Sequence, residues 1–282
     1  MAALTDLSDL INRQTGGNSG NPESLFFFKL PRVAGAAATA PIGGRTMSLW
    51  RYEGMPNGGS APTTGEILTR SSVGAMPFLA PGGGREKLLI GAALSSVISG
   101  TYVLYDRLYQ IGGFDATVTT DLTVQGSTPT PALTRNTGGV GNFAFVIIST
   151  LIGTTSTTLT MTYTNQAGTT GRTSTVNIGG TGFREATRAM LIPLAAGDTG
   201  IRAVEKVKLT ASTGTAGNFG IVIGRPLATI PVGAAGVMGW RDYTTGLPGI
   251  PSIDTNACLS LLFTPSSATA PELFGSLSFV EK

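Results

Sequence analysis

The sequence contains no histidine among its 282 residues. This absence excludes Ser–His–Asp and Cys–His nucleophile systems, histidine metal sites and the commonest general base. Histidine is also the side chain that ordinarily titrates near neutrality, so we expect assembly to be almost independent of pH between about 5 and 8. We predict no catalytic residues, no cofactor and no metal site, and we expect a protein that is not an enzyme.

Cysteine is nearly absent as well. A single cysteine, Cys258, excludes an intrachain disulfide and any paired-cysteine metal or redox motif. It stands in the apolar run Cys258–Phe263, which favours a small buried hydrophobic side chain over a reactive thiol.

Charged residues are scarce. Asp, Glu, Lys and Arg make up 12% of the chain, about half of what is usual for a soluble domain. A surface with so little charge tends to associate, so the composition predicts a protein that packs against copies of itself or another partner. The net charge of +3 comes from scattered basic residues, and we expect no direct nucleic-acid binding.

Long hydrophobic runs are missing too. The longest apolar stretch, residues 221–239, is interrupted by Arg225, Pro226 and Pro231, which argues against a membrane span. The segment Met1–Asp6 lacks the basic start and apolar core of a signal peptide. We therefore expect a soluble chain made without export.

The chain is instead rich in residues that favour turns and β-strands. The chain has 40 glycines and 16 prolines, and its clearest pattern is Thr158–Thr164, where Leu159, Met161 and Tyr163 alternate with threonine. This alternation predicts a half-buried strand with the apolar side chains toward the core, paired as a hairpin with Thr173–Ile178. We predict an all-β fold, a jelly-roll-like β-sandwich with an extended Gly/Ala/Pro-rich N-terminal arm.

Two short segments resemble one another. Gly141–Ile147 reads GNFAFVI and Gly217–Ile223 reads GNFGIVI. Two strands that begin alike can be neighbours in one sheet, although chance similarity in a glycine-rich chain explains the match equally well.

Composition suggests three parts: residues 1–84 as an N-terminal helix and arm, 85–231 as the central sandwich, and 232–282 as a loop and hairpin that complete it. Residues 33–84 are weakly patterned, which fits either an arm held by contacts outside its own fold or a loop-rich β subdomain. In the last part, residues 257–263 and 273–280 are expected to pair as a hairpin.

The N-terminal part offers two sets of candidate contact residues. Residues 4–13 form an amphipathic helix that lies on its own domain or docks on a neighbouring subunit. Three adjacent phenylalanines follow, and they cannot all face one core because neighbours on a strand point to opposite sides. The candidates are Leu4, Leu7, Leu10 and Ile11 in the helix and Phe26, Phe27 and Phe28 in the strand.

Other patterns carry little chemistry. Gly139–Ala144 matches a dinucleotide-binding fingerprint in letters, but it precedes a strand where the fingerprint follows one. Asp106 and Arg107 are adjacent on an expected strand, so each is expected to meet a partner elsewhere. Trp240, Asp242 and Tyr243 form the one compact set of aromatic and acidic residues that would suit a sugar or receptor.

Several segments together resemble a group of virion structural proteins of tailed bacteriophages. The resemblance covers roughly residues 100 to 230, and it rests on the combined order of the motifs. They are Tyr105–Leu108 with Ile111–Gly113, Tyr163–Gly168, Gly180–Glu185 and Gly214–Phe219.

This resemblance implies a non-enzymatic structural protein of a phage particle, assembled in the bacterial host cytoplasm. Its expected partners are copies of itself, with a trimer as one candidate state, and the major capsid protein or another virion protein. The leading hypothesis is decoration or cementing of the capsid shell. The alternatives are a structural position at the neck, tail or fibre base, and a receptor- or carbohydrate-binding β module that would use Trp240 and Tyr243.

Overall fold

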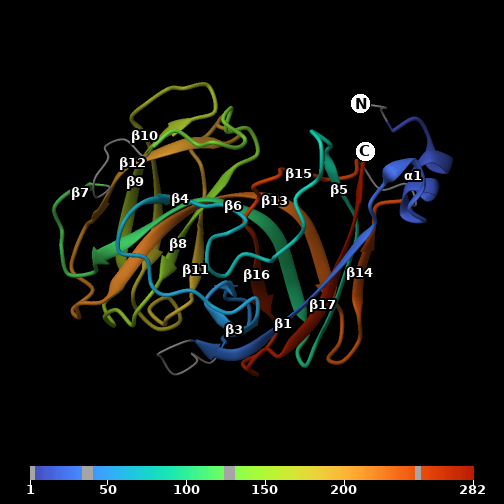
Figure 1. Cartoon of the computed structure of the whole chain (residues 1–282). Coiled ribbons are helices and arrows are strands. Elements are labelled where there is room, and N and C mark those ends of the chain that lie inside the picture. The colour runs from blue at the N-terminus through green and yellow to red at the C-terminus, as the bar shows by residue number, and fades with distance from the viewer. Residues whose placement is uncertain (1–3, 34–40, 124–130, 245–248) are drawn as a thin grey trace.

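The computed structural model describes residues 4–33, 41–123, 131–244 and 249–282. Within these residues the chain is almost entirely β, with three antiparallel sheets that we call A, B and C (Figure 1). This confirms the all-β fold class. No helix in this part of the chain has the length and hydropathy needed to cross a lipid bilayer.

Sheet A joins the beginning and the end of the chain. Strand β1 pairs with β17 along seven residues, from Glu23 opposite Phe279 to Lys29 opposite Leu273. In order across the sheet the strands are β14 (Gly239–Asp242), β5 (Lys87–Ser96), β17 (Leu273–Glu281), β1 (Glu23–Val33) and β3 (Tyr52–Met55), with β15 (Ser252–Ile253) paired to β5.

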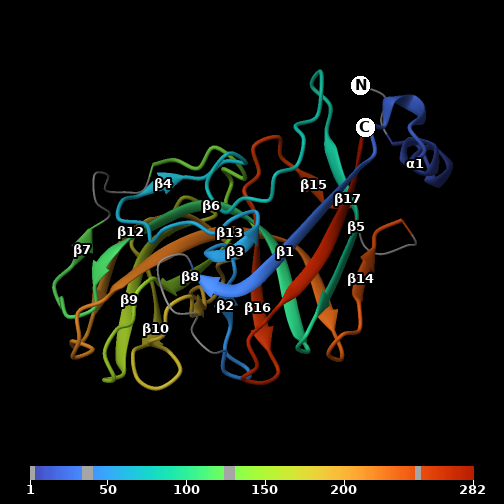
Figure 2. The same ribbon diagram turned by 60° about the horizontal axis from the view of Figure 1, so that its bottom comes forward.

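Sheet B contains the two longest strands, which pair with each other and run through the middle of the molecule (Figures 1 and 2). Its order is β11 (Ala189–Ile192), β8 (Phe143–Ile148), β13 (Asn218–Val232), β6 (Gly100–Asp115), β16 (Leu259–Pro265) and β2 (Met47–Ser48), with β4 (Glu66–Ile67) paired to β6.

The two long strands are shared by two sandwiches. Tyr102 and Leu104 of β6 belong to a core formed with sheet A, whereas Ile111 and Phe114 of the same strand belong to a second core formed with sheet C. Irregularities in the β6–β13 register lie between the two parts, and such bulges bend a strand and re-aim its side chains. The cores are therefore separate, but the strands that support them are continuous.

Sheet C carries the predicted hairpin. Leu159, Met161 and Tyr163 are fully buried, and Arg172 to Ile178 pair with Tyr163 back to Thr157. The predicted register is confirmed, because alternate side chains of a pleated strand face opposite sides. The sheet order is β10 (Arg172–Ile178), β9 (Thr157–Asn165), β12 (Ile201–Leu209) and β7 (Leu122–Thr123).

The two similar segments are neighbours. Strand β8 pairs with β13 from Phe143 opposite Gly224 to Ile148 opposite Phe219. Alternate residues of both, among them Val146 and Ile221, enter the core shared with sheet C. The interpretation as adjacent strands is confirmed.

The N-terminal segment differs from the expected extended arm. Strand β1 is an interior strand of sheet A, and β2, β3 and β4 each pair with strands of sheets A or B. Residues of the weakly patterned stretch, including Met47, Tyr52, Met76 and Phe78, are buried in the core between sheets A and B. Their isolated apolar side chains are stabilised by burial against strands distant in sequence. Residues 34–40 of the expected arm, residues 245–248 of the expected C-terminal loop and residues 124–130 lie outside the described residues.

The C-terminal strands do not form the expected hairpin. Strand β16 pairs with β6 and β2 in sheet B, whereas β17 pairs with β5 and β1 in sheet A. The alternation behind the expectation is real, since Leu261 and Phe263 face the same core as Leu277 and Phe279. The two strands therefore meet face to face across the core and not edge to edge.

Candidate subunit interface

The outer face of sheet A, which points away from the core, carries three of the candidate contact residues, Phe26, Phe28 and Trp240. The register places Trp240, Ala93, Ser276 and Phe26 in one row across four strands. Phe27 lies on the opposite face and is fully buried in the core. The three phenylalanines therefore do not all face one core, as predicted.

An aromatic patch occupies this outer face on strands β1, β3 and β17. We use this name for Phe26, Phe28, Phe274 and Met55. The ring centres of the three phenylalanines lie 6.1 to 6.5 Å apart, within the usual range for packed aromatic pairs. Phe26 is 49% exposed and Phe274 51%. Because aromatic side chains that leave water gain the most from association, this patch is suited to burial against another protein surface.

Two patch residues were not predicted from the sequence. Phe274 of β17 and Met55 of β3 each stand opposite Phe28 of β1, one on either side. The sequence does contain a signal for Phe274. It is an odd number of residues away from the inward Leu273, Leu277 and Phe279, so alternation predicts an outward side chain. Alternation does not predict which strand lies beside it.

Trp240 and Tyr243, at the β14 edge, have different surroundings. Trp240 is 51% exposed, whereas Tyr243 packs against the core between sheets A and B. Burial raises the pKa of the Tyr243 hydroxyl above its ordinary value. The structure therefore does not bring the two side chains together on one surface.

The predicted helix is present as α1 (Leu7–Gln14), followed by the 3-10 turn η1 (Gly17–Ser19). The Asp6 side chain caps it by accepting a hydrogen bond from the Asp9 backbone N–H, 2.8 Å away. Leu10 is buried against Leu88 and Val280, with Leu4 packed alongside. The helix thus lies on its own domain, at the upper end of the outer face of sheet A.

The opposite side of α1 is open to solvent. Leu7 is 55% exposed and Ile11 50% exposed, so two of the four helix candidates remain available for a contact. They form a second, smaller apolar surface on the helix, apart from the aromatic patch.

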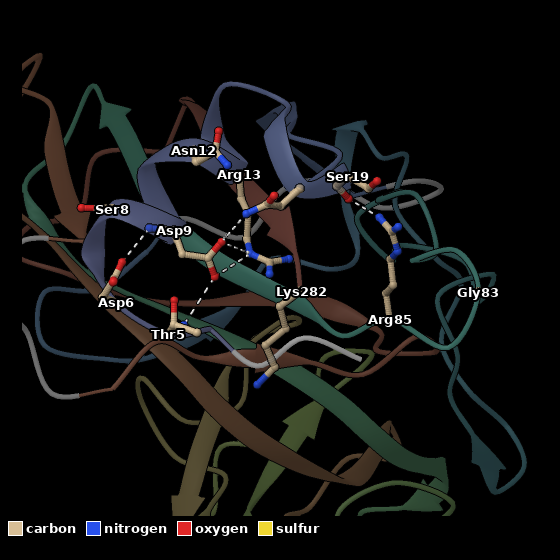
Figure 3. Close-up of a pocket in the computed structure, with 11 residues that line it drawn as sticks. Thr5, Asp6, Ser8, Asp9, Asn12, Arg13, Ser19, Gly83, Arg85 and Lys282 are labelled. Carbon is tan, nitrogen blue, oxygen red and sulfur yellow. Dashed lines mark hydrogen bonds and ion pairs between the residues drawn. The ribbon is translucent and has the colours of Figure 1, made fainter.

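A polar hollow of about 850 Å³ lies beside α1 (Figure 3). Its central carboxylate, Asp9, accepts hydrogen bonds from the side chains of Asn18 and Arg13 and from the Thr5 backbone. The Asn18 hydrogen bond is the main cause that lowers the pKa of Asp9. The carboxylate is thus kept ionised by contacts that fix the helix, and Arg85 is likewise hydrogen-bonded to the Ser19 carbonyl.

The interior holds several buried charged groups. Asp106 pairs with Arg135, and the Arg107 guanidinium lies 4.1 Å from the centre of the Trp50 ring. This confirms that Asp106 and Arg107 each meet partners elsewhere. Lys29 is 2% exposed and donates to the Tyr52 and Pro56 carbonyls. Among the described residues there is no cluster of three or more Cys, Asp or Glu able to hold a metal ion.

The comparisons with known proteins give a distant likeness. No protein-family model matches the chain, and no curated protein matches it. A chain of the T=1 particles derived from infectious bursal virus is 10% identical, with 93% of this chain and 78% of that chain covered and a TM-score of 0.20. A chain of the infectious bursal disease virus VP2 subviral particle is 9% identical, with 93% of this chain and 80% of that chain covered and a TM-score of 0.19. Both are chains of viral particles, and at these scores neither likeness carries an argument.

Proposed function

We propose that this chain is a non-enzymatic structural protein of a virus particle, and more specifically that it decorates or cements the head shell of a tailed bacteriophage. Its partners are copies of itself and the major capsid protein or another virion protein. The resemblance of residues 100 to 230 to phage virion proteins supports the class of particle. Positions at the neck, tail or fibre base are the alternatives within the same class.

The aromatic patch is the observation that carries this proposal. A chain that remained a free monomer would leave Phe26, Phe274 and Met55 in water, together with the exposed Leu7 and Ile11 of α1. The clustered exposed side chains of the aromatic patch mark a protein contact, and the low charge of the chain removes the repulsion that would keep copies apart.

The test compares three proteins: wild type, the double variant Phe26→Ser/Phe274→Ser, and the control Val140→Ser. Val140 is 63% exposed but lies in the other sandwich, bridged to Gly200 next to strand β12. Mass photometry and sedimentation velocity give the oligomer size, and circular dichroism checks the fold. We expect the patch variant to associate at least ~30-fold more weakly, which corresponds to ~2 kcal/mol at an interface hot spot, while Val140→Ser associates like wild type.

Full assembly of the patch variant would overturn the interface, and wild-type protein that stays monomeric at all concentrations would overturn self-association. Electron microscopy of the native particle then decides among head, neck, tail and fibre base. A chain found in none of these places would contradict the proposed class.

A further inference from the structure

The outer face of sheet A is hollowed on the side away from the aromatic patch, between Trp240 and the end of α1. The groove measures about 310 Å³, and it shares Gln14, Ile90 and Ser278 with a neighbouring hollow of about 290 Å³. Together they cross strands β14, β5, β17 and β1, a width of about 14 Å at the ~4.8 Å spacing of neighbouring strands. The groove is therefore an elongated, open feature.

The floor of this groove is made of small residues that the fold does not require. Gly91, Ala93, Ser276 and Ser278 lie at outward positions of β5 and β17. A Cβ atom on Gly91 would meet the Arg241 carbonyl oxygen at 3.6 Å and the Ser278 Cβ at 3.7 Å, which are ordinary contacts. A larger side chain would fit the backbone at this position, and it would close the groove.

One wall is an exposed indole with several polar side chains nearby. Trp240 is 51% exposed, whereas the other tryptophan, Trp50, is 2% exposed. Around it the groove offers the hydroxyls of Thr244, Ser276 and Ser278 and the Gln14 amide. An indole beside hydroxyl and amide groups combines an apolar surface with hydrogen-bonding partners.

The charged residues of the groove balance each other and are engaged within the chain. Asp242 accepts hydrogen bonds from the Thr244 backbone and hydroxyl, and the Arg241 Nε donates to the Thr229 carbonyl at 2.8 Å. Arg241 and Asp242 leave this groove without net charge, and the adjoining hollow adds the Glu23 carboxylate, which is paired with Lys87, so the lining offers an anionic ligand no excess of positive charge. A purely apolar ligand would leave the serine and glutamine groups without partners, at a cost in binding free energy.

We propose that this groove binds a neutral oligosaccharide. A sugar ring has an apolar C–H face that packs on an indole and a rim of hydroxyls that bond to serine, threonine and glutamine side chains. The open, elongated shape accommodates a chain of sugars with both ends in solvent. The aromatic patch borders this site, since Phe26 stands opposite Ser276, but none of its residues lines the groove, so binding and subunit association are tested with different variants.

The test screens the full chain on an array of immobilised neutral and sialylated oligosaccharides, followed by titration of retained neutral compounds. Isothermal titration calorimetry measures binding by every variant, and the fluorescence of the exposed Trp240 gives a second readout in the proteins that keep it. Two variants disrupt the groove: Trp240→Ala removes the wall and Gly91→Thr fills the floor. Phe274→Ser is the matched control, since Phe274 is equally exposed, at 51%, on the same face outside the groove. Thermal melting verifies that each variant folds.

We expect both groove variants to bind at least tenfold more weakly than wild type and Phe274→Ser to bind unchanged. The proposal is overturned if no neutral oligosaccharide is retained, if only sialylated ones are retained, or if Trp240→Ala binds like wild type. A loss of association in Phe26→Ser/Phe274→Ser with unchanged sugar binding separates this site from the subunit interface.

Discussion

Arg135 holds Asp106 through two parallel hydrogen bonds, from Nε to Oδ2 and from Nη2 to Oδ1, each 2.9 Å long. Both side chains are buried, and Asp106 also accepts a hydrogen bond from the Cys258 backbone N–H at 2.7 Å. Asp106 lies in β6 between the part that supports one sandwich and the part that supports the other. This pair therefore fixes the shared strand where its side chains change cores.

Removing the charge of Asp106 while Arg135 stays in place is expected to reduce the stability of the fold. Asp106→Asn keeps an acceptor for the Cys258 N–H but leaves the Arg135 guanidinium buried without a counter-charge. We expect a loss of about 3–5 kcal/mol in the free energy of unfolding, measured by urea titration. The double variant Asp106→Asn/Arg135→Met should recover part of the loss. If the double variant loses the sum of the two single losses, the residues are not coupled.

Lys29 is expected to give the protein a pH dependence that the absence of histidine did not predict. Burial lowers the pKa of its ammonium group to about 7, and the nearby positive Arg107 adds to the effect. An unfolded lysine titrates near 10.4. Between about pH 7 and 10 the unfolded state therefore binds more protons than the folded state, so stability should rise with pH across that window, by up to ~1.4 kcal/mol per pH unit. Below about pH 7 this contribution is constant.

Urea titrations at pH 6, 7.5 and 9 test this expectation. Lys29→Met should raise the free energy of unfolding at pH 6 by about 1–4 kcal/mol and remove most of the slope, because it replaces a buried charge by an apolar side chain. Lys208→Met, at an exposed lysine of β12, is the control and should keep the slope. Wild-type stability that is level from pH 7.5 to 9 would show that Lys29 titrates normally.

The two faces of strand β9 are expected to respond differently to substitution. Met161→Ala should cost about 2–5 kcal/mol because it removes buried atoms and leaves a cavity. On the other face Thr160 stands opposite Lys208 of β12. Thr160→Lys should therefore destabilise by about 0.2–1 kcal/mol through like-charge repulsion, and Thr160→Glu should stabilise by a similar amount.

Thermal melting of the three variants at low ionic strength measures these differences. Added salt should reduce the effects at Thr160 and leave the Met161→Ala effect unchanged. Equal effects of Thr160→Lys and Thr160→Glu would show that Lys208 does not face that position.

Alternation of apolar residues predicted the buried face of strand β9, but alternation does not predict which strands pair. Leu159, Met161 and Tyr163 are buried as expected, and their hairpin partner is local in sequence, so a short turn fixes the register. Leu277 and Phe279 of β17 also alternate with serines, yet β17 pairs with β1 and β5 and not with the preceding strand β16. Alternation gives the orientation of side chains, whereas strand pairing also depends on long-range contacts that a short segment does not encode.

The candidate interface was predictable to the same extent. The three adjacent phenylalanines were expected not to face one core together, and Phe26 and Phe28 do face away from Phe27, but the patch is completed by Phe274, almost 250 residues later in the chain. Tyr243 shows the converse, because its sequence neighbours suggested a surface group and its side chain packs on the core. Sequence spacing alone does not distinguish an aromatic residue exposed on the surface of a sheet from one that packs against the core.

The pairing of β1 with β17 has a consequence for how the protein is made. Strand β1 is synthesised well before β17, so this edge of β1 stays unpaired until the ribosome has made Leu273–Glu281. Sheet A therefore closes only after β17 has emerged, and pairing over so long a separation is slow. During that delay Phe26 and Phe28 are exposed on a strand with a free edge, which favours aggregation of nascent chains. A chain truncated before residue 273 would keep that free edge permanently.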